Sequence, residues 1–214
     1  SAPNGGQGGY ISLVSGAGTA RSSGKIVVKT VNAGTKGISG ALEFTSGAST
    51  SGNSGEIKLT TGTGVLGKSG DITLNVGSGN TGTGGLVGIT AGTTTAGSGV
   101  GGAITLTSGD SNDGNTGAID LITDAGAAVT GAIGLTTGDS TGAASGDVAV
   151  TTGTSGATTT GTLTLETGAS TNGGKGGALT LSVGNAQTGA GGGIQATAGQ
   201  TSGGAQGGFA QING

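Results

Sequence analysis

The chain has 214 residues, of which 56 are glycine, and it contains no Cys, His, Met or Trp. Without Cys and His it has no disulfide, no thiolate nucleophile, no Cys/His zinc site and no general base that titrates near neutral pH. Its net charge of −3, with 8% charged residues, does not supply the basic stripe that nucleic-acid binding requires. These absences argue against an enzyme, and we expect no cofactor.

Residues 1–9 form an N-terminal lead-in before the first regular segment. This stretch lacks an initiating Met and lacks the charged and apolar regions of a signal peptide. We therefore expect the chain to be processed or cut from a longer protein. No stretch approaches 18 consecutive apolar residues, so we expect no membrane insertion.

A repeat of about 15 residues runs from Tyr10 to the end of the chain. Each repeat opens with a five-residue segment whose second and fourth positions are apolar, the period of a strand with one buried face. The 14 opening segments begin at residues 10, 25, 41, 56, 71, 86, 103, 118, 132, 147, 162, 178, 193 and 209. This regular parity argues against flexible disorder, the usual state of Gly/Ser/Thr-rich chains.

Glycine marks both ends of each opening segment. It precedes all 14 segments, and it occupies the seventh position in 11 of the 13 repeats that are complete there. Glycine tolerates positive φ and close backbone approach, which tight corners require. The Gly/Ser/Thr-rich stretches that follow, such as 47–55, 109–117 and 138–146, are predicted to return the chain without forming a helix.

The repeat predicts an all-β fold, a parallel β-solenoid of about 14 stacked 15-residue repeats in a single domain spanning residues 10–214. The alternative is seven coils of about 30 residues, because a 15-residue coil would place Glu56 beside Asp71. Against this alternative, residues 71–92 match residues 178–199 seven repeats later. That odd number would exchange the two faces of a two-repeat coil, so we favour the 15-residue coil.

The charged residues separate along the chain. Positive charge gathers at Arg21, Lys25, Lys29 and Lys36. An acidic stretch without Lys or Arg follows, containing Asp110, Asp113, Asp120, Asp124, Asp139 and Asp147. We interpret it as a solvated face.

A weak candidate calcium site lies at 110–115, where Asp110, Asn112, Asp113 and Asn115 offer the oxygen ligands that hard cations prefer. The EF-hand pattern needs a Glu at its twelfth position, and Leu121 stands there. The calcium-binding β-roll needs Asp in every turn, and most turns here lack it. We therefore predict no metal site.

Catalysis has one conceivable carboxylate pair. Asp120 and Asp147 could in principle support glycoside hydrolysis. Both occupy outward positions of opening segments, so we interpret them as exposed aspartates and predict no catalytic residues.

Three stretches carry a resemblance to a known group of proteins: GALEFTSGASTSGNSG (40–55), GDITLNVGSGNTGTGG (70–85) and GAITLTSGDSNDGNTG (102–117). They resemble the glycine-rich repeats of very large predicted secreted proteins in diatoms and related marine algae. The resemblance covers nearly the whole chain after residue 9. It implies an extracellular or surface structural role and no catalytic residues.

These observations predict a structural or adhesive protein at the cell surface or outside the cell, part of a fibre or surface layer. Its expected partners are other copies of itself end to end, a longer parent array, or a glycan or other surface. The alternative is an ice-binding or crystalline-glycan-binding module. Thr105 and Thr107 form the only Thr-x-Thr pair at the third and fifth positions, so a flat regular face is not evident.

Overall fold

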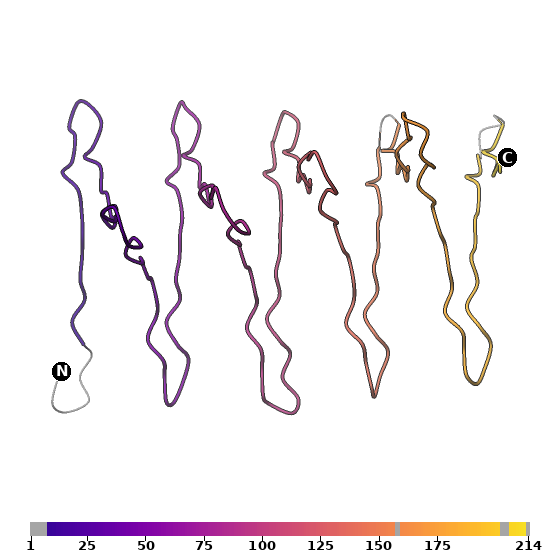
Figure 1. Ribbon diagram of the computed structural model, residues 1–214, viewed down its shortest axis with the longest axis horizontal. Coiled ribbons are helices and arrows are strands. Elements are labelled where there is room, and N and C mark those ends of the chain that lie inside the picture. The colour runs from indigo at the N-terminus through magenta and orange to yellow at the C-terminus, as the bar shows by residue number, and fades with distance from the viewer. Residues whose placement is uncertain (1–7, 157–158, 202–205, 213–214) are drawn as a thin grey trace. The chain divides into compact units, whose positions relative to one another are not determined.

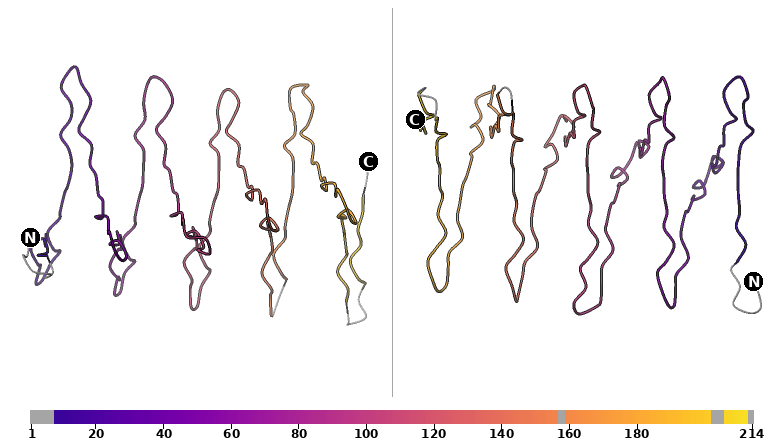
Figure 2. Two further views of the ribbon diagram at one scale, coloured as in Figure 1. Left: turned by 90° about the horizontal axis from the view of Figure 1, so that it is seen from below. Right: turned by 180° about the vertical axis from the view of Figure 1, so that it is seen from behind.

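The computed structural model describes residues 8–156, 159–201 and 206–212. Residues 1–7 of the predicted lead-in therefore lie outside the described residues. Within these ranges the backbone forms neither α-helix nor β-strand, and Figures 1 and 2 show it as a plain trace without coils or arrows. The predicted all-β parallel solenoid is therefore wrong, for both the 15-residue and the 30-residue coil.

The reason lies in where the backbone hydrogen bonds go. A parallel solenoid joins residues one coil apart, about 15 or about 30 positions along this sequence. The described residues instead make short-range bonds: Gly24 N–H to Gly16 O (2.9 Å), Gly102 to Gly92 (2.8 Å), Gly117 to Gly109 (3.0 Å), Gly208 to Gly199 (2.9 Å) and Gly99 to Ala96 (3.1 Å). The chain thus bonds to itself within a repeat, and the opening segments form no ladder.

The predicted apolar columns do not form a core. None of the described side chains is buried, and the second-position side chains from Ile26 to Ile194 are 48–64% exposed. Those at the fourth position from Val28 to Leu181 are 54–76% exposed. The chain exposes 21033 Å², whereas a folded monomer of this mass exposes about 8,400 Å² and its unfolded chain about 28,000 Å².

The 15-residue period survives as a local pattern of turns. The chain turns at residues 19–21, 35–37, 50–52, 65–67, 80–83, 96–98, 112–114, 127–128, 141–143, 156, 171–173 and 187–189. Each turn begins at the tenth or eleventh position of its repeat. Gly52 (φ 107°) and Gly173 (φ 79°) occupy the twelfth position with the positive φ that glycine adopts at little steric cost.

The chain divides into two units, Ser1–Ile104 and Thr105–Gly214. Each contains the same succession of exposed opening segments and turns. The predicted single repeat domain at 10–214 stays a prediction as to its boundaries. The described residues contain no helix that is long and apolar enough to cross a bilayer.

Candidate functional site

Each repeat closes on itself at the glycine that precedes the next repeat, which we call the closing glycine. The 13 closing glycines are residues 24, 40, 55, 70, 85, 102, 117, 131, 146, 161, 177, 192 and 208. At every one, a Cβ atom would lie within 4 Å of the sixth residue of the preceding repeat. At Gly40, for example, it would lie 3.5 Å from Thr30 Cγ2. That distance is an ordinary contact, whereas at Gly85 and Gly192 the Cβ would lie 2.6 Å and 2.9 Å from a Val Cγ1, too close without a shift of the neighbouring side chain.

The sixth position is the least exposed place in the repeat. Six of the described residues are half-buried, and all six occupy it: Ser15, Ser46, Ala91, Ser108, Thr137 and Ala198. Four closures add a hydrogen bond from the closing-glycine N–H to the seventh-residue carbonyl. At another, Thr167 Oγ1 donates to Gly177 O at 3.1 Å. We call this contact between a closing glycine and the sixth and seventh residues the loop closure.

Our interpretation of the sequence missed the sixth position, although its signal is present. The residue there is Ser, Thr, Val or Ala in all 13 repeats that reach a closing glycine. Small side chains at one position, always about nine residues before an invariant glycine, indicate two backbone segments in close approach. Apolar periodicity does not reveal them, because they are small and do not alternate with polar residues.

Hydroxyl side chains stabilise several turns. Ser111 Oγ accepts from Gly114 N–H at 2.9 Å, and Ser140 Oγ accepts from Ala143 N–H at 3.1 Å. Both serines occupy the ninth position of their repeats, directly before the turn. Side-chain acceptors of this kind offer the backbone a local partner in place of a sheet or helix.

The candidate calcium residues lie at one of these turns. Asp110 Oδ1 accepts from Ser111 N–H at 2.8 Å, and the chain turns at 112–114. In the described part of the chain, no three His, Cys, Asp or Glu side chains gather where they could hold a metal ion. Asn112, Asp113 and Asn115 are exposed. The expectation that these residues bind no metal stays a prediction.

The other candidates lie on open surface. Asp120 and Asp147 belong to different opening segments, both are exposed, and the described residues enclose no pocket beside them. Thr105 and Thr107 are exposed on one opening segment. The expectation that Asp120 and Asp147 are not catalytic stays a prediction, and so does the alternative of an ice-binding or crystalline-glycan-binding module.

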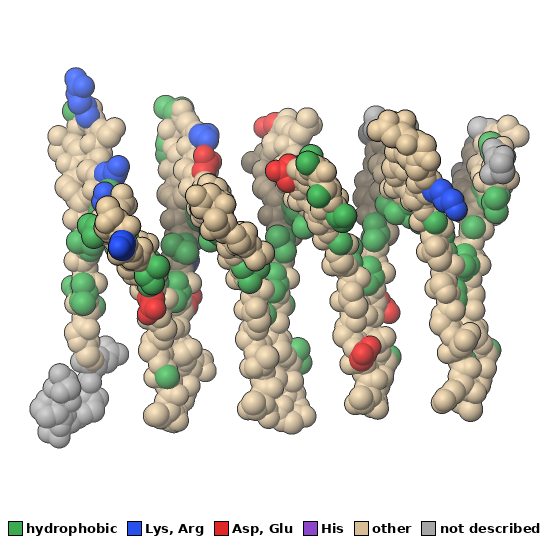
Figure 3. Space-filling view, in the orientation of Figure 1, with side chains coloured by type: hydrophobic (Ala, Val, Ile, Leu, Met, Phe, Trp, Pro, Cys, Tyr) green, Lys and Arg blue, Asp and Glu red, His purple; other side chains and the backbone are tan. Residues whose placement is uncertain are grey.

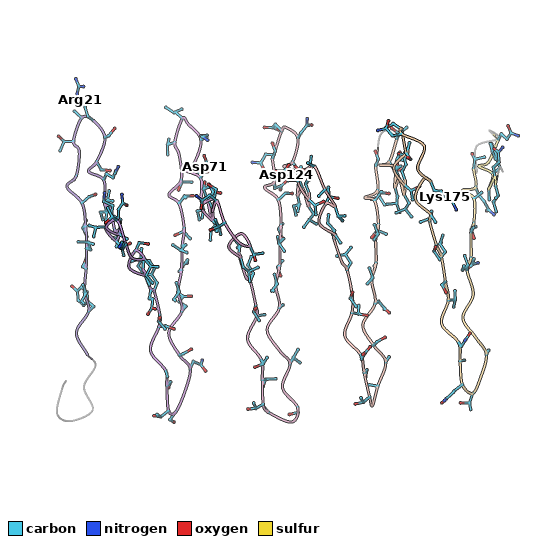
Figure 4. All side chains as sticks on the ribbon, in the orientation of Figure 1. Arg21, Asp71, Asp124 and Lys175 are labelled. Carbon is cyan, nitrogen blue, oxygen red and sulfur yellow. The ribbon has the colours of Figure 1, made fainter. Side chains whose placement is uncertain are left out.

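Aliphatic and charged side chains are exposed at intervals along the chain, among a larger area of backbone and other side chains (Figure 3). Hydrophobic side chains emerge along the chain in Figure 3, because nothing covers the second and fourth positions. Among the described residues there is one ion pair, Lys68 Nζ to Asp71 Oδ2 at 3.1 Å, and both side chains are exposed. Arg21 projects from a loop where the chain turns at 19–21 (Figure 4). The features available for recognition are thus exposed aliphatic pairs and exposed charges.

Comparison with protein-family models, with curated proteins and with solved structures finds no match to this chain. The resemblance to algal glycine-rich repeats accordingly stays a prediction.

Proposed function

We propose that this chain is a structural, adhesive repeat protein that self-associates into a fibre or surface layer, at the cell surface or outside the cell. One observation carries the proposal. Nearly every repeat presents two aliphatic side chains, at the second and fourth positions, with about half or more of their surface exposed. Exposed apolar side chains that recur in this way provide surface that binding to another macromolecule would cover.

The free energy of burial favours a state in which a partner covers the aliphatic side chains. Full burial of one Ile, Leu or Val side chain is worth about 1.5–3 kcal/mol, so covering the exposed part contributes about 1 kcal/mol per side chain. The opening segments also leave their backbone N–H and C=O groups without a ladder, as the edge strand of a sheet does. Both features are satisfied when another extended segment lies alongside.

Other copies of the chain are the partners that the repeat favours. The same apolar pair recurs about every 15 residues, so two copies offer many equivalent registers in which segments can meet. A longer parent array would supply the same segments within one molecule. The resemblance to secreted algal repeats supports the extracellular location, and the exposed hydroxyl and amide groups suit contact with a glycan surface.

Sedimentation velocity over a hundredfold range of concentration tests the proposal, with electron microscopy of the most concentrated sample. We expect the mean mass to rise with concentration and the images to show filaments or sheets. A second arm measures retention on insoluble polysaccharide. A chain that stays monomeric throughout and binds no surface would contradict the proposal.

A further inference from the structure

The two units of the chain carry opposite net charge. Unit Ser1–Ile104 contains six Lys and Arg residues and three Asp and Glu residues, a net charge of +3. Unit Thr105–Gly214 contains one Lys and seven Asp and Glu residues, a net charge of −6. Together they give the −3 of the whole chain. The net charge of the first unit of one copy is therefore opposite to that of the second unit of another copy.

Most of the charge lies in two segments. The basic segment, residues 21–36, holds four positive charges and no carboxylate. The acidic segment, residues 110–147, holds six Asp and no Lys or Arg. The one ion pair in the described part of the chain, Lys68 with Asp71, lies outside both segments.

The acidic segment keeps acceptor capacity. Asp110 and Asp124 each use one carboxylate oxygen, Oδ1, to accept the N–H of the following residue at 2.8 Å. A carboxylate has about four acceptor positions, so both groups can still receive a Lys or Arg. Asp113, Asp120, Asp139 and Asp147 are exposed.

Exposed aliphatic side chains accompany the charges in both segments. In the basic segment Ile26 and Val28 lie between Lys25 and Lys29 and are 48% and 54% exposed. In the acidic segment Ile119 and Leu121 flank Asp120 and are 50% and 69% exposed. Opposite charges steer two such surfaces together and select the register, while the apolar area supplies most of the affinity.

We infer that the basic segment of one copy binds the acidic segment of a second copy, which deepens the proposed function and rests on it. Because each copy carries both segments, its basic segment can bind one neighbour and its acidic segment another. Each pair then keeps one free basic and one free acidic segment, which makes the contact heterologous. A heterologous contact that does not close into a ring propagates without limit. The assembly is therefore a head-to-tail polymer whose formation depends on salt.

The test uses the full chain and two charge-reversed variants. The first carries Arg21→Glu, Lys25→Glu, Lys29→Glu and Lys36→Glu. The second carries Asp113→Lys, Asp120→Lys, Asp139→Lys and Asp147→Lys, and leaves intact Asp110 and Asp124, which accept local backbone hydrogen bonds. A control variant reverses charges outside both segments, with Lys58→Glu, Lys68→Glu and Lys175→Glu.

We expect the unaltered chain to associate at about 0.02 M salt and to do so much more weakly at about 0.5 M. Each four-residue variant alone should associate about tenfold or more weakly. An equimolar mixture of the two should regain the association, because the reversed segments complement each other. The control variant alone should associate nearly as strongly as the unaltered chain. When it is mixed with the Asp→Lys variant, it should restore no more association than the unaltered chain restores in the same mixture.

Each contrary result overturns a defined claim. If the strength of association is the same at both salt concentrations and in both charge-reversed variants, the charge pairing is refuted, whereas self-association is not. Salt-dependent compaction at constant monomer mass shows pairing within one molecule and refutes the second copy. No association of the unaltered chain at any salt concentration refutes this inference and the self-association on which it rests.

Discussion

Within each repeat, the loop closure and the opening segment differ in what holds them. The closure joins residues 8 to 11 positions apart through glycine and a small sixth residue, and it contains the only half-buried side chains among the described residues. The opening segment carries most of the Ile, Leu and Val residues and leaves them about half or more exposed. Local order and apolar area thus belong to different residues, whereas an ordinary domain combines them in one core. The lone chain is held by short-range contacts, and its apolar area remains for a partner.

Heating the dilute chain tests this separation with the largest expected effect. A folded protein of 214 residues absorbs about 150 kcal/mol in one cooperative transition. Because each closure forms independently and no core links them, we expect no such transition in calorimetry below the concentration of association. A single sharp calorimetric peak from the monomeric chain would show that the repeats share a core.

Removing apolar side chains from two neighbouring repeats tests the opening segments. Ile57→Ser, Leu59→Ser, Ile72→Ser and Leu74→Ser together remove apolar surface whose burial on association is worth about 4 kcal/mol. We therefore expect association to weaken about a thousandfold. Sedimentation velocity measures the change. Thr60→Ala with Thr73→Ala, at the fifth and third positions of the same segments, should leave association nearly unchanged. Equal effects in the two variants would mean that the aliphatic pairs are not the contact surface.

Two closing glycines offer a matched test of the closures. At Gly24 a Cβ would lie 3.3 Å from both Gly16 N and Ser15 Cβ, whereas at Gly117 the corresponding distances to Gly109 N and Ser108 Cβ are 3.6 Å. We expect Gly24→Ala to weaken its closure by about 1 kcal/mol, which corresponds to amide exchange at residue 24 that is roughly fivefold faster. Gly117→Ala should have a smaller effect on its own amide. The interpretation fails if the two substitutions act equally.

The smallest expected effect concerns a turn. Ser111→Ala removes the acceptor of the Gly114 N–H, and we expect exchange of that amide to accelerate about two- to fivefold. Ser111→Thr keeps the hydroxyl and should restore most of the protection. Amide exchange followed by NMR measures both, and unchanged exchange in the Ala variant would show that the hydroxyl contributes nothing.

The sequence predicts the repeat, its glycines and its turns well, and the global fold poorly. Glycine before each opening segment, and a turn after it, follow from residue types whose conformational preferences are local. The hydrogen-bond partner of an extended segment is not a local property. The alternation in EIKLT at 56–60 is satisfied equally by another coil or by another molecule. We chose the first, and the structure leaves Ile57 and Leu59 exposed.

The candidate site shows the same division. The absence of His and Cys can be read directly from the sequence, and so can the separation of the basic segment from the acidic segment. The closure could have been found from the small sixth residue and the invariant glycine together. The hydrogen bonds of Ser111 and Asp110 depend on how each turn is formed, which residue identity alone leaves open.

The loop closures also determine how the chain responds to tension. Opening one closure releases its 8 to 11 residues, which extend by about 3.4 Å each and so lengthen the molecule by about 25–35 Å. Each closure is weak, and a loop of about ten residues reforms in about 10–100 ns. Thirteen closures in series would therefore lengthen at low force and recover without hysteresis. Reversible extension of this kind would suit the structural role proposed above if the assembly is stretched repeatedly.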